Sequence, residues 1–216
     1  MMAGPFLFEG PCMNTDTVIL ATAWIHQPAL STRPARTLIV GAATLTVRYR
    51  FGDLGFDLEA HSTTVTDDPH ETMTWLAERL HVPPARLLLW RAEDIVVPSL
   101  ISACDTARDT MAAAQLLREL KLVFEGDVMD VAEGYGGYAA TSFDAVAHAA
   151  GAVFVPMSTA DLAEAHRTGG HGAIRQHLAA RVKATWQLWL KGREDGDSLI
   201  AATDAWLTTP DAEVRA

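Results

Sequence analysis

Hydrophobic and polar positions along the first third of the chain predict three strands. Residues 17–25, TVILATAWI, are apolar or β-branched without alternation, which is typical of a strand buried on both faces. Residues 37–51 predict one long strand or a pair of strands, and apolar and polar side chains alternate through their second half. Residues 56–65 follow a glycine-containing turn and predict a third strand. We therefore expect three antiparallel strands at the start of the fold.

The first helical pattern covers residues 66–80, TDDPHETMTWLAERL. Asp68 has the chemistry of an N-cap, a proline occupies the first helical position after it, and Glu71 would complete a capping box. The acidic and histidine side chains of this segment (Asp67, Asp68, His70 and Glu71) also form a set of metal-ligand types. Helix capping explains them with fewer assumptions, so we expect a helix start here.

A short strand and further helices follow. Residues 87–90, LLLW, predict a buried strand, and residues 97–120 predict one helix or two with a break near Asp105. Residues 126–140 predict a helix that ends in a glycine-rich turn. Their Gly-Tyr-Gly-Gly run is a weak phosphate-loop signal, because no strand precedes it directly and no Lys-Ser/Thr follows. A helix stop is the simpler interpretation.

In the same segment, Asp127 and Asp130 are expected on one face of a helix start, where carboxylates complement the helix dipole. Residues 141–151 predict a short capped helix that ends at a glycine, and residues 158–166 predict another with a Ser-x-x-Asp opening. The polar tail that follows residue 192 predicts one last short helix.

The strongest helical pattern is residues 172–190, where apolar side chains recur at every fourth position. This spacing puts them on one buried face. The residues are Ile174, Leu178, Val182, Trp186 and Leu190.

The order of these elements predicts an α/β protein with a mixed sheet. No linker-like change of composition divides the chain. We expect an irregular lead-in over residues 1–15, a single domain over residues 16–192, and a C-terminal extension with a short helix over residues 193–216.

Composition and charge narrow the class of partner. The 216 residues carry a formal net charge of −10, which is the wrong sign for a dedicated duplex-DNA binder or for an anionic membrane surface. No apolar run is long enough to span a membrane, and the N-terminal residues lack a positively charged signal region. Two cysteines, Cys12 and Cys104, make neither a disulfide framework nor a zinc set, and Cys104 is expected in the core. We expect a cytoplasmic protein.

Signals for catalysis are few. The chain has neither a Gly-x-Ser-x-Gly elbow nor a His-Glu-x-x-His motif. His166 and His171 flank a glycine turn and have the chemistry of metal ligands, but a solvated loop is the simpler interpretation. Most tryptophans lie in apolar elements and are expected in the core, whereas Trp206 near the C-terminus is a candidate partner contact.

Four blocks of sequence carry a resemblance to a known family. A strand that ends in Trp-Arg leads to a helix start with Pro-Ser-Leu (residues 90–100). Asp-Val-Met-Asp (127–130), Ser-Phe-Asp (142–144) and His-Leu-Ala-Ala-Arg-Val-Lys-Ala-Thr (177–185) follow in order. With three strands before them, these blocks resemble the predicted 3′–5′ exonucleases related to the proofreading domain of family B DNA polymerases. Those enzymes belong to the DEDD group of the ribonuclease H-like fold.

The resemblance implies a ribonuclease H-like mixed sheet, with three antiparallel strands followed by parallel strands, flanked by helices. It also implies a site in which four carboxylates hold two divalent metals that cleave a phosphodiester. At the positions that match those carboxylates, this chain has Leu20, Thr22, Val96 and Arg181, and the family's tyrosine position holds His177.

All four metal-binding carboxylates are therefore missing in this alignment. A shifted alignment supplies Glu9 for the first motif, or Glu93 or Asp94 for the second, and it leaves Arg181 in the third. An arginine there would repel a metal ion, so we expect loss of the metal site.

This pattern predicts a catalytically degenerate exonuclease-like domain, a non-enzyme that acts as a binding or scaffold module. In one version, Arg91, Arg181 and Lys183 bind single-stranded nucleic acid without cutting it. In the other, Arg181 pairs with Glu93 or Asp94 and the useful surface is a protein–protein interface.

Neither version requires a cofactor or a membrane. The alternative function is an active exonuclease that uses Mg²⁺ or Mn²⁺ on a shifted ligand set. A third reading is an unrelated α/β domain whose resemblance is accidental.

Overall fold

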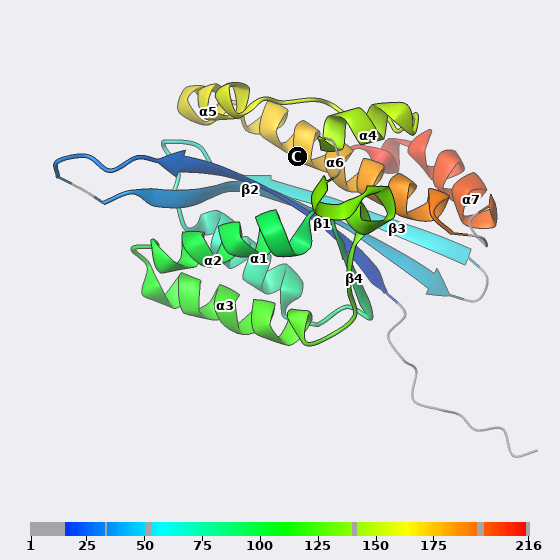
Figure 1. Cartoon of the computed structure of the whole chain (residues 1–216), viewed down its shortest axis with the longest axis horizontal. Helices are drawn as coiled ribbons and strands as arrows, with labels where there is room; N and C mark the ends of the chain where they lie inside the picture. Colours follow the sequence, from blue (N-terminus) through cyan, green and yellow to red (C-terminus); the bar gives the residue numbers. More distant parts are fainter. Residues whose placement is uncertain (1–15, 33, 51–52, 140–141, 194–196, 215–216) are drawn as a thin grey trace, which may run out of the picture.

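Five strands form one mixed sheet, and helices flank both of its faces (Figure 1). The structure is a computed structural model and describes residues 16–32, 34–50, 53–139, 142–193 and 197–214. The lead-in expected over the first fifteen residues, with Glu9 and Cys12, lies outside the described residues.

The sheet has the strand order β3-β2-β1-β4-β5. Strands β1 (Thr17–Gln27), β2 (Arg36–Arg50) and β3 (Asp53–Ser62) are antiparallel neighbours, as the sequence predicts. Strands β4 (Arg86–Leu89) and β5 (Val128–Asp130) run parallel to β1 on its other side. Residues 37–50 thus belong to one long strand rather than to a pair.

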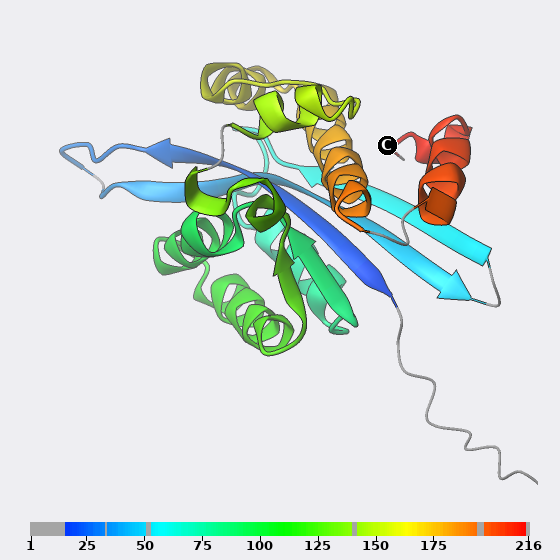
Figure 2. The same ribbon diagram turned by 45° about the vertical axis from the view of Figure 1, so that its right-hand side comes forward.

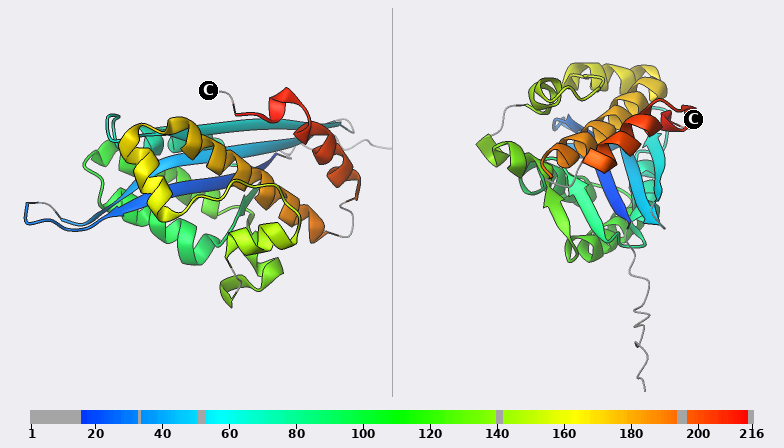
Figure 3. Two further views of the ribbon diagram at one scale, coloured as in Figure 1. Left: turned by 90° about the horizontal axis from the view of Figure 1, so that it is seen from above. Right: turned by 90° about the vertical axis from the view of Figure 1, so that its right-hand side faces the viewer.

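Seven α-helices are described, in two layers. One layer lies below the sheet in Figure 1 and the other above it, with α6 crossing the strands diagonally (Figures 2 and 3). The first layer is α1 (Glu71–Leu80), α2 (Val97–Asp105) and α3 (Thr110–Phe124). The second layer is α4 (Phe143–Ala149), α5 (Thr159–Thr168), α6 (His171–Lys191) and α7 (Asp197–Leu207).

Strand β1 is buried on both faces because it lies in the middle of the sheet. Its odd-numbered residues Ile19, Ala21 and Ala23 belong to the core that includes α6, and Leu20 belongs to the core that includes α1, α2 and α3. Alternation of side chains along a strand produces this division. The unpatterned apolar run at 17–25 is therefore explained, and that prediction is confirmed.

Helix α6 packs closely on β2 at Gly41. A Cβ atom at this glycine would lie 2.7 Å from Leu178 Cδ1 and 2.9 Å from Ile174 Cγ2. The predicted apolar face of α6 is confirmed as core, since each of its members is at most 3% exposed. They are Ile174, Leu178, Val182, Trp186 and Leu190.

The start of α1 differs from the expected capping box. The helix begins at Glu71 and its N-cap is His70, whose side chain makes no cap hydrogen bond. The carboxylate of Asp68 instead accepts from the His70 backbone N–H at 2.9 Å and lies 3.1 Å from His70 Nδ1. Asp68 thus closes a turn before the helix, which removes it from the capping role.

The segment 126–140 was expected to be helical, and that prediction is wrong. Residues Val128–Asp130 form strand β5, because they pair with β4 at the edge of the sheet. Two short 3-10 turns follow, Val131–Tyr135 and Gly137–Ala139. The expected break near Asp105 is confirmed, since α2 ends there.

The C-terminal residues pack against the sheet. Trp206 on α7 is 9% exposed, and its ring stacks on Phe56 of β3 with centroids 4.5 Å apart. The expectation of a partner contact at Trp206 is therefore wrong, because its ring surface is used inside the molecule. Cys104 is 6% exposed, as expected, and burial raises the pKa of its thiol to about 11. Within the described ranges, no helix has the length and apolar character needed to cross a membrane.

Candidate functional site

The four positions matched to metal-binding carboxylates do not converge. Leu20 is 2% exposed and Val96 is 6% exposed, and both belong to the core beneath α1, α2 and α3. Thr22 shares the face of Leu20 by strand alternation. Arg181 lies on α6, which packs on the opposite face of the sheet. The expected grouping of these four residues is wrong, because Leu20, Thr22 and Val96 lie on the face of the sheet opposite to α6.

The residues of β1 in the core that includes α6 are Ile19, Ala21, Ala23 and Ile25, and each of the two alanines is 5% exposed. Neighbouring residues in a strand point to opposite faces, so Ala21 and Ala23 lie on the other face from Leu20 and Thr22. Neither alanine has a carboxylate. In register, Ala21 is level with Trp90, the first residue after β4, because Ile19 pairs with Leu88.

Arg181 lies on an aromatic side chain. Its guanidinium carbon is 4.2 Å from the centroid of the Phe143 ring at the start of α4. Burial lowers the pKa of Arg181, and the nearby Asp144 carboxylate acts in the opposite direction. Among the described residues, no carboxylate lies within ion-pair distance of this guanidinium and no hydrogen bond reaches it. The expected partners Glu93 and Asp94 do not pair with it.

His177 lies one turn before Arg181 on α6. Its Nδ1 atom is 2.6 Å from the Val155 carbonyl oxygen, so Nδ1–H is the donor and Nε2 is the free ring nitrogen of the neutral form. Burial lowers the pKa of His177, and the positive charge of Arg181 lowers it further. The Val155 carbonyl and the Asp144 carboxylate oppose this effect.

Phe143 is held in place by other aromatic rings. Trp90 contacts it edge to face with centroids 5.2 Å apart, and Phe154 does so at 6.0 Å. Phe143 is 5% exposed. The sequence marked this residue as the start of a helix and gave no sign that its ring supports an arginine. Asp144, the acidic neighbour of both α6 side chains, was missed for the same reason.

Arg91 and Lys183 do not extend this site into a basic groove. Arg91 donates from Nε to Asp94 at 2.8 Å and lies over the Tyr138 ring. Lys183 donates to the carbonyl of Ala212 at 3.2 Å and lines a cavity of about 500 Å³ between α6 and the C-terminal residues. The structure therefore gives the three predicted basic residues three different settings.

Asp130 has a structural role that the sequence did not predict. Its carboxylate accepts backbone hydrogen bonds from Arg91 at 2.8 Å, Ala92 at 2.7 Å and Ala132 at 2.9 Å. These bonds hold Arg91 at a φ of 58°, a left-handed value that is uncommon for residues with a Cβ atom. The expected shared helical face of Asp127 and Asp130 is absent because both precede or belong to β5.

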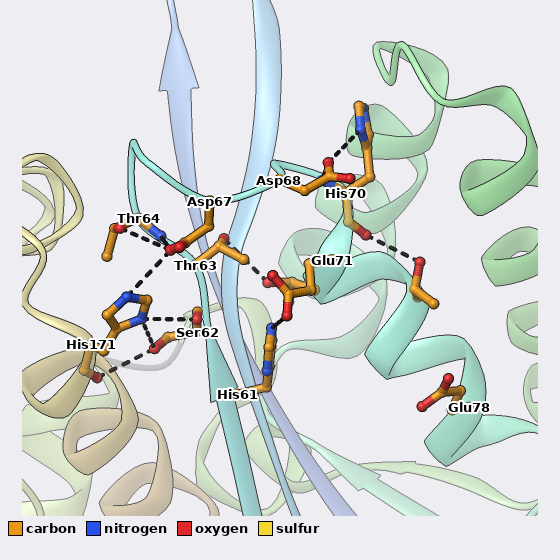
Figure 4. Close-up of polar contacts among 12 residues, drawn as sticks. His61, Ser62, Thr63, Thr64, Asp67, Asp68, His70, Glu71, Glu78 and His171 are labelled. Atoms are coloured by element: carbon orange, nitrogen blue, oxygen red, sulfur yellow. Dashed lines mark hydrogen bonds and ion pairs between the residues drawn. The ribbon is translucent and has the colours of Figure 1, made fainter. Parts of the chain in front are cut away.

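A second polar cluster joins the end of β3 to the starts of α1 and α6 (Figure 4). His171 Nε2 lies 3.3 Å from Asp67 Oδ2, and His171 Nδ1 lies 3.2 Å from Ser62 Oγ. The Asp67 carboxylate also accepts from the Thr64 backbone N–H at 2.6 Å. Hydrogen bonds from Thr64 lower the pKa of Asp67.

This Ser-His-Asp contact locks a loop rather than presenting a nucleophile. Ser62 is 6% exposed, and its hydroxyl also lies 3.3 Å from the backbone carbonyl of His171. His166 is 9% exposed and its Nδ1 is 3.1 Å from the Thr63 carbonyl. The expectation that His166 and His171 lie on a solvated loop is wrong, because both are helical residues that bind the 62–67 segment.

Metal-ligand types do not gather elsewhere in the part of the chain that the structure describes: no group of three or more His, Cys, Asp or Glu side chains has the arrangement of a metal site there. In comparisons with known proteins, no protein-family model matches the chain and no curated protein matches it.

Proposed function

We propose that this chain is a catalytically degenerate 3′–5′ exonuclease-like domain that acts as a non-cleaving binding or scaffold module. The sheet supports a ribonuclease H-like assignment, because three antiparallel strands are followed by two strands parallel to β1 in the order β3-β2-β1-β4-β5. The long helix α6 against β1 and β2 agrees with the same assignment.

The observation that carries the proposal is the chemistry of β1 and α6 on the sheet face that they share, where a one-residue shift of the alignment in β1 would place the catalytic site. The α6-facing side of β1 has Ala21 and Ala23, and α6 contributes Arg181. Two-metal cleavage of a phosphodiester requires carboxylate oxygens as ligands. A guanidinium within about 5 Å of a divalent cation repels it by several kcal/mol at an effective dielectric constant of about 20. This charge favours binding of an anion over binding of a metal.

A protein partner fits the charge distribution better than a long nucleic-acid strand does. Arg91 is paired with Asp94. Lys183 lines a cavity that His177 and Arg181 do not line. A strand-tracking groove needs a continuous run of free basic side chains. The net charge of −10 acts in the same direction. Single-stranded nucleic acid remains the second partner class to test.

The decisive experiment incubates the purified full chain with an end-labelled single strand and Mg²⁺ or Mn²⁺. We expect no shortening of the strand. Cleavage that is abolished by EDTA and survives Arg181→Ala would show a working metal site on other residues and would overturn the proposal.

Partner class is tested by co-purification from the native host with and without nuclease treatment. A protein that stays bound after nuclease treatment supports the scaffold role. Binding to single strands that weakens steeply with salt supports the nucleic-acid role instead, because counterion release accompanies phosphate contacts.

A further inference from the structure

The guanidinium of Arg181 is held ready for an anion. Its guanidinium carbon lies 4.2 Å from the centroid of the Phe143 ring, and the N–H donors of a guanidinium lie around the edge of its plane. Arg181 is partly exposed. A free, oriented guanidinium of this kind matches the oxygens of a phosphate or carboxylate.

His177 supplies a second group beside Arg181. The bond from Nδ1–H to the Val155 carbonyl fixes the ring, so Nε2 is the nitrogen that gains a proton. The charged groups that face the ring are Arg181 on α6 and Asp144 on α4. An anion bound at Arg181 would cancel the repulsion between the two α6 side chains. Protonation of Nε2 would then add another donor toward the anion.

The surroundings limit the ligand to one anionic group. Arg91 is engaged by Asp94, and Lys183 donates to a backbone carbonyl beside a different cavity. Within the part of the chain that the structure describes, neither Arg91 nor Lys183 is free to extend the site for a polyanion. Asp144 lies close enough to attract both His177 and Arg181, so it opposes the approach of a second negative charge.

We propose that Arg181, His177 and Phe143 form a binding site for a single phosphate group, either free phosphate or a phosphate monoester, with proton uptake by His177 on binding. The site deepens the non-cleaving function proposed above and rests on it. Phe143 positions the guanidinium, Arg181 provides the charge, and His177 makes the affinity depend on pH.

Isothermal titration calorimetry tests the site with inorganic phosphate, thymidine 5′-monophosphate and an unphosphorylated oligothymidylate. We expect the first two to bind and the third to bind more weakly. Equal affinity for phosphate and the monoester would show that the shared phosphate group accounts for binding. Tighter binding of one of them would show whether the natural ligand is free phosphate or a phosphate monoester. Failure of both to bind at about pH 6 overturns the proposal.

Sulfate separates the protonation of His177 from that of the ligand, because sulfate keeps the same charge between about pH 6 and about pH 8, whereas a histidine titrates in this range. The affinity for sulfate is expected to fall as pH rises, and titrations in buffers of different ionisation enthalpy should show proton uptake. His177→Asn keeps a donor for Val155 and should remove the pH dependence. Unchanged pH dependence in that variant contradicts the coupling to His177.

Arg181→Gln should weaken phosphate binding by roughly tenfold or more, as expected for lost charged hydrogen bonds. The matched control is Arg167→Gln on α5, an exposed arginine paired with Glu164, which should leave the affinity unchanged. Asp144→Asn keeps Arg181 and removes a negative charge beside it, so it should tighten phosphate binding. This variant tests the site if Arg181→Gln does not fold. Unchanged or weaker binding in Asp144→Asn contradicts the proposal.

The two proposals fail in different ways. Metal-dependent cleavage of a strand would end the non-cleaving function, whatever the phosphate affinity is. Wild-type phosphate affinity in Arg181→Gln would end the site proposed here and leave the non-cleaving function untouched.

Discussion

The guanidinium of Arg181 lies 4.2 Å from the centre of the Phe143 ring, although the two residues are on different helices. An arginine on an aromatic face gains about 0.5–2 kcal/mol, with the larger values in desolvated settings. The contact explains how a charged side chain is accommodated beside a buried helix face without a carboxylate partner among the described residues. It also fills the place where the resemblance puts an aspartate.

Arg181→Asp alone is expected to give no exonuclease activity. Ala21 and Ala23 would still leave the facing side of β1 without metal ligands. The measurement is shortening of an end-labelled single strand with Mg²⁺ or Mn²⁺. EDTA-sensitive shortening by this variant, and not by the unaltered chain, would show that other ligands are already in place.

Gly41→Ala should destabilise the fold by roughly 1–3 kcal/mol, because the added methyl overlaps Leu178 and Ile174 and forces α6 away from β2. The measurement is the free energy of unfolding from urea denaturation. Gly172→Ala on α6 is the matched control, since a Cβ atom at Gly172 meets nothing within 4 Å. That control should be neutral or stabilising by up to about 1 kcal/mol. Equal effects of the two variants would contradict the close packing of α6.

Asp130→Ala should cost roughly 1–3 kcal/mol, because three backbone N–H groups lose their shared acceptor. The turn from β4 into Ala92–Val96 should loosen, which faster amide hydrogen exchange at Arg91 and Ala92 would report. Asp127→Ala is the control, since that carboxylate makes an exposed ion pair with Arg86 and should contribute about 1 kcal/mol or less. Unchanged exchange at Ala92 in the Asp130 variant would argue against the proposed anchor.

Stability should fall as the pH drops below the ordinary histidine pKa of 6.5, in part through His177. Burial and Arg181 lower the pKa of His177 in the folded state, so the unfolded chain binds more protons there. The stabilising contribution is complete above 6.5 and is lost as the pH falls through the lowered folded value. Burial lowers the pKa of His61 as well, and it acts in the same direction.

The measurement for this prediction is the urea midpoint as a function of pH. His177→Asn should flatten the curve below pH 6.5, the ordinary histidine value. His148→Asn, at an exposed position on α4, is the control and should leave the curve unchanged. A slope that His177→Asn does not alter would show that this ring does not change its protonation on unfolding.

The sequence predicted the fold best where one local pattern sufficed. The run at 17–25 required burial on both faces, and β1 is the middle strand of the sheet. The four-residue spacing in 172–190 predicted the buried face of α6. It failed at 126–140, because residues with helical propensity become a strand when an open sheet edge offers backbone partners.

The candidate site depended on contacts between distant segments. Register in β1 decides whether Leu20 or Ala21 faces α6, and a one-residue error exchanges the two faces. Phe143 comes beneath Arg181 only when α4 packs on α6. His171 and Asp67 lie within ion-pair distance at the end of the sheet. Their local sequence patterns, a glycine turn before His171 and a capping pattern around Asp67, did not predict this contact.

The sequence by itself determined the α/β class, the central buried strand, the apolar face of α6 and the presence of an arginine at residue 181, because these follow from side-chain chemistry and short-range periodicity. Only the tertiary structure decided which strand face meets α6, that Arg181 rests on Phe143 without a carboxylate partner among the described residues, and that Arg91 rather than Arg181 takes Asp94. These outcomes depend on packing between elements far apart in the chain. Small differences in register and orientation there determine which side chains lie close enough to interact.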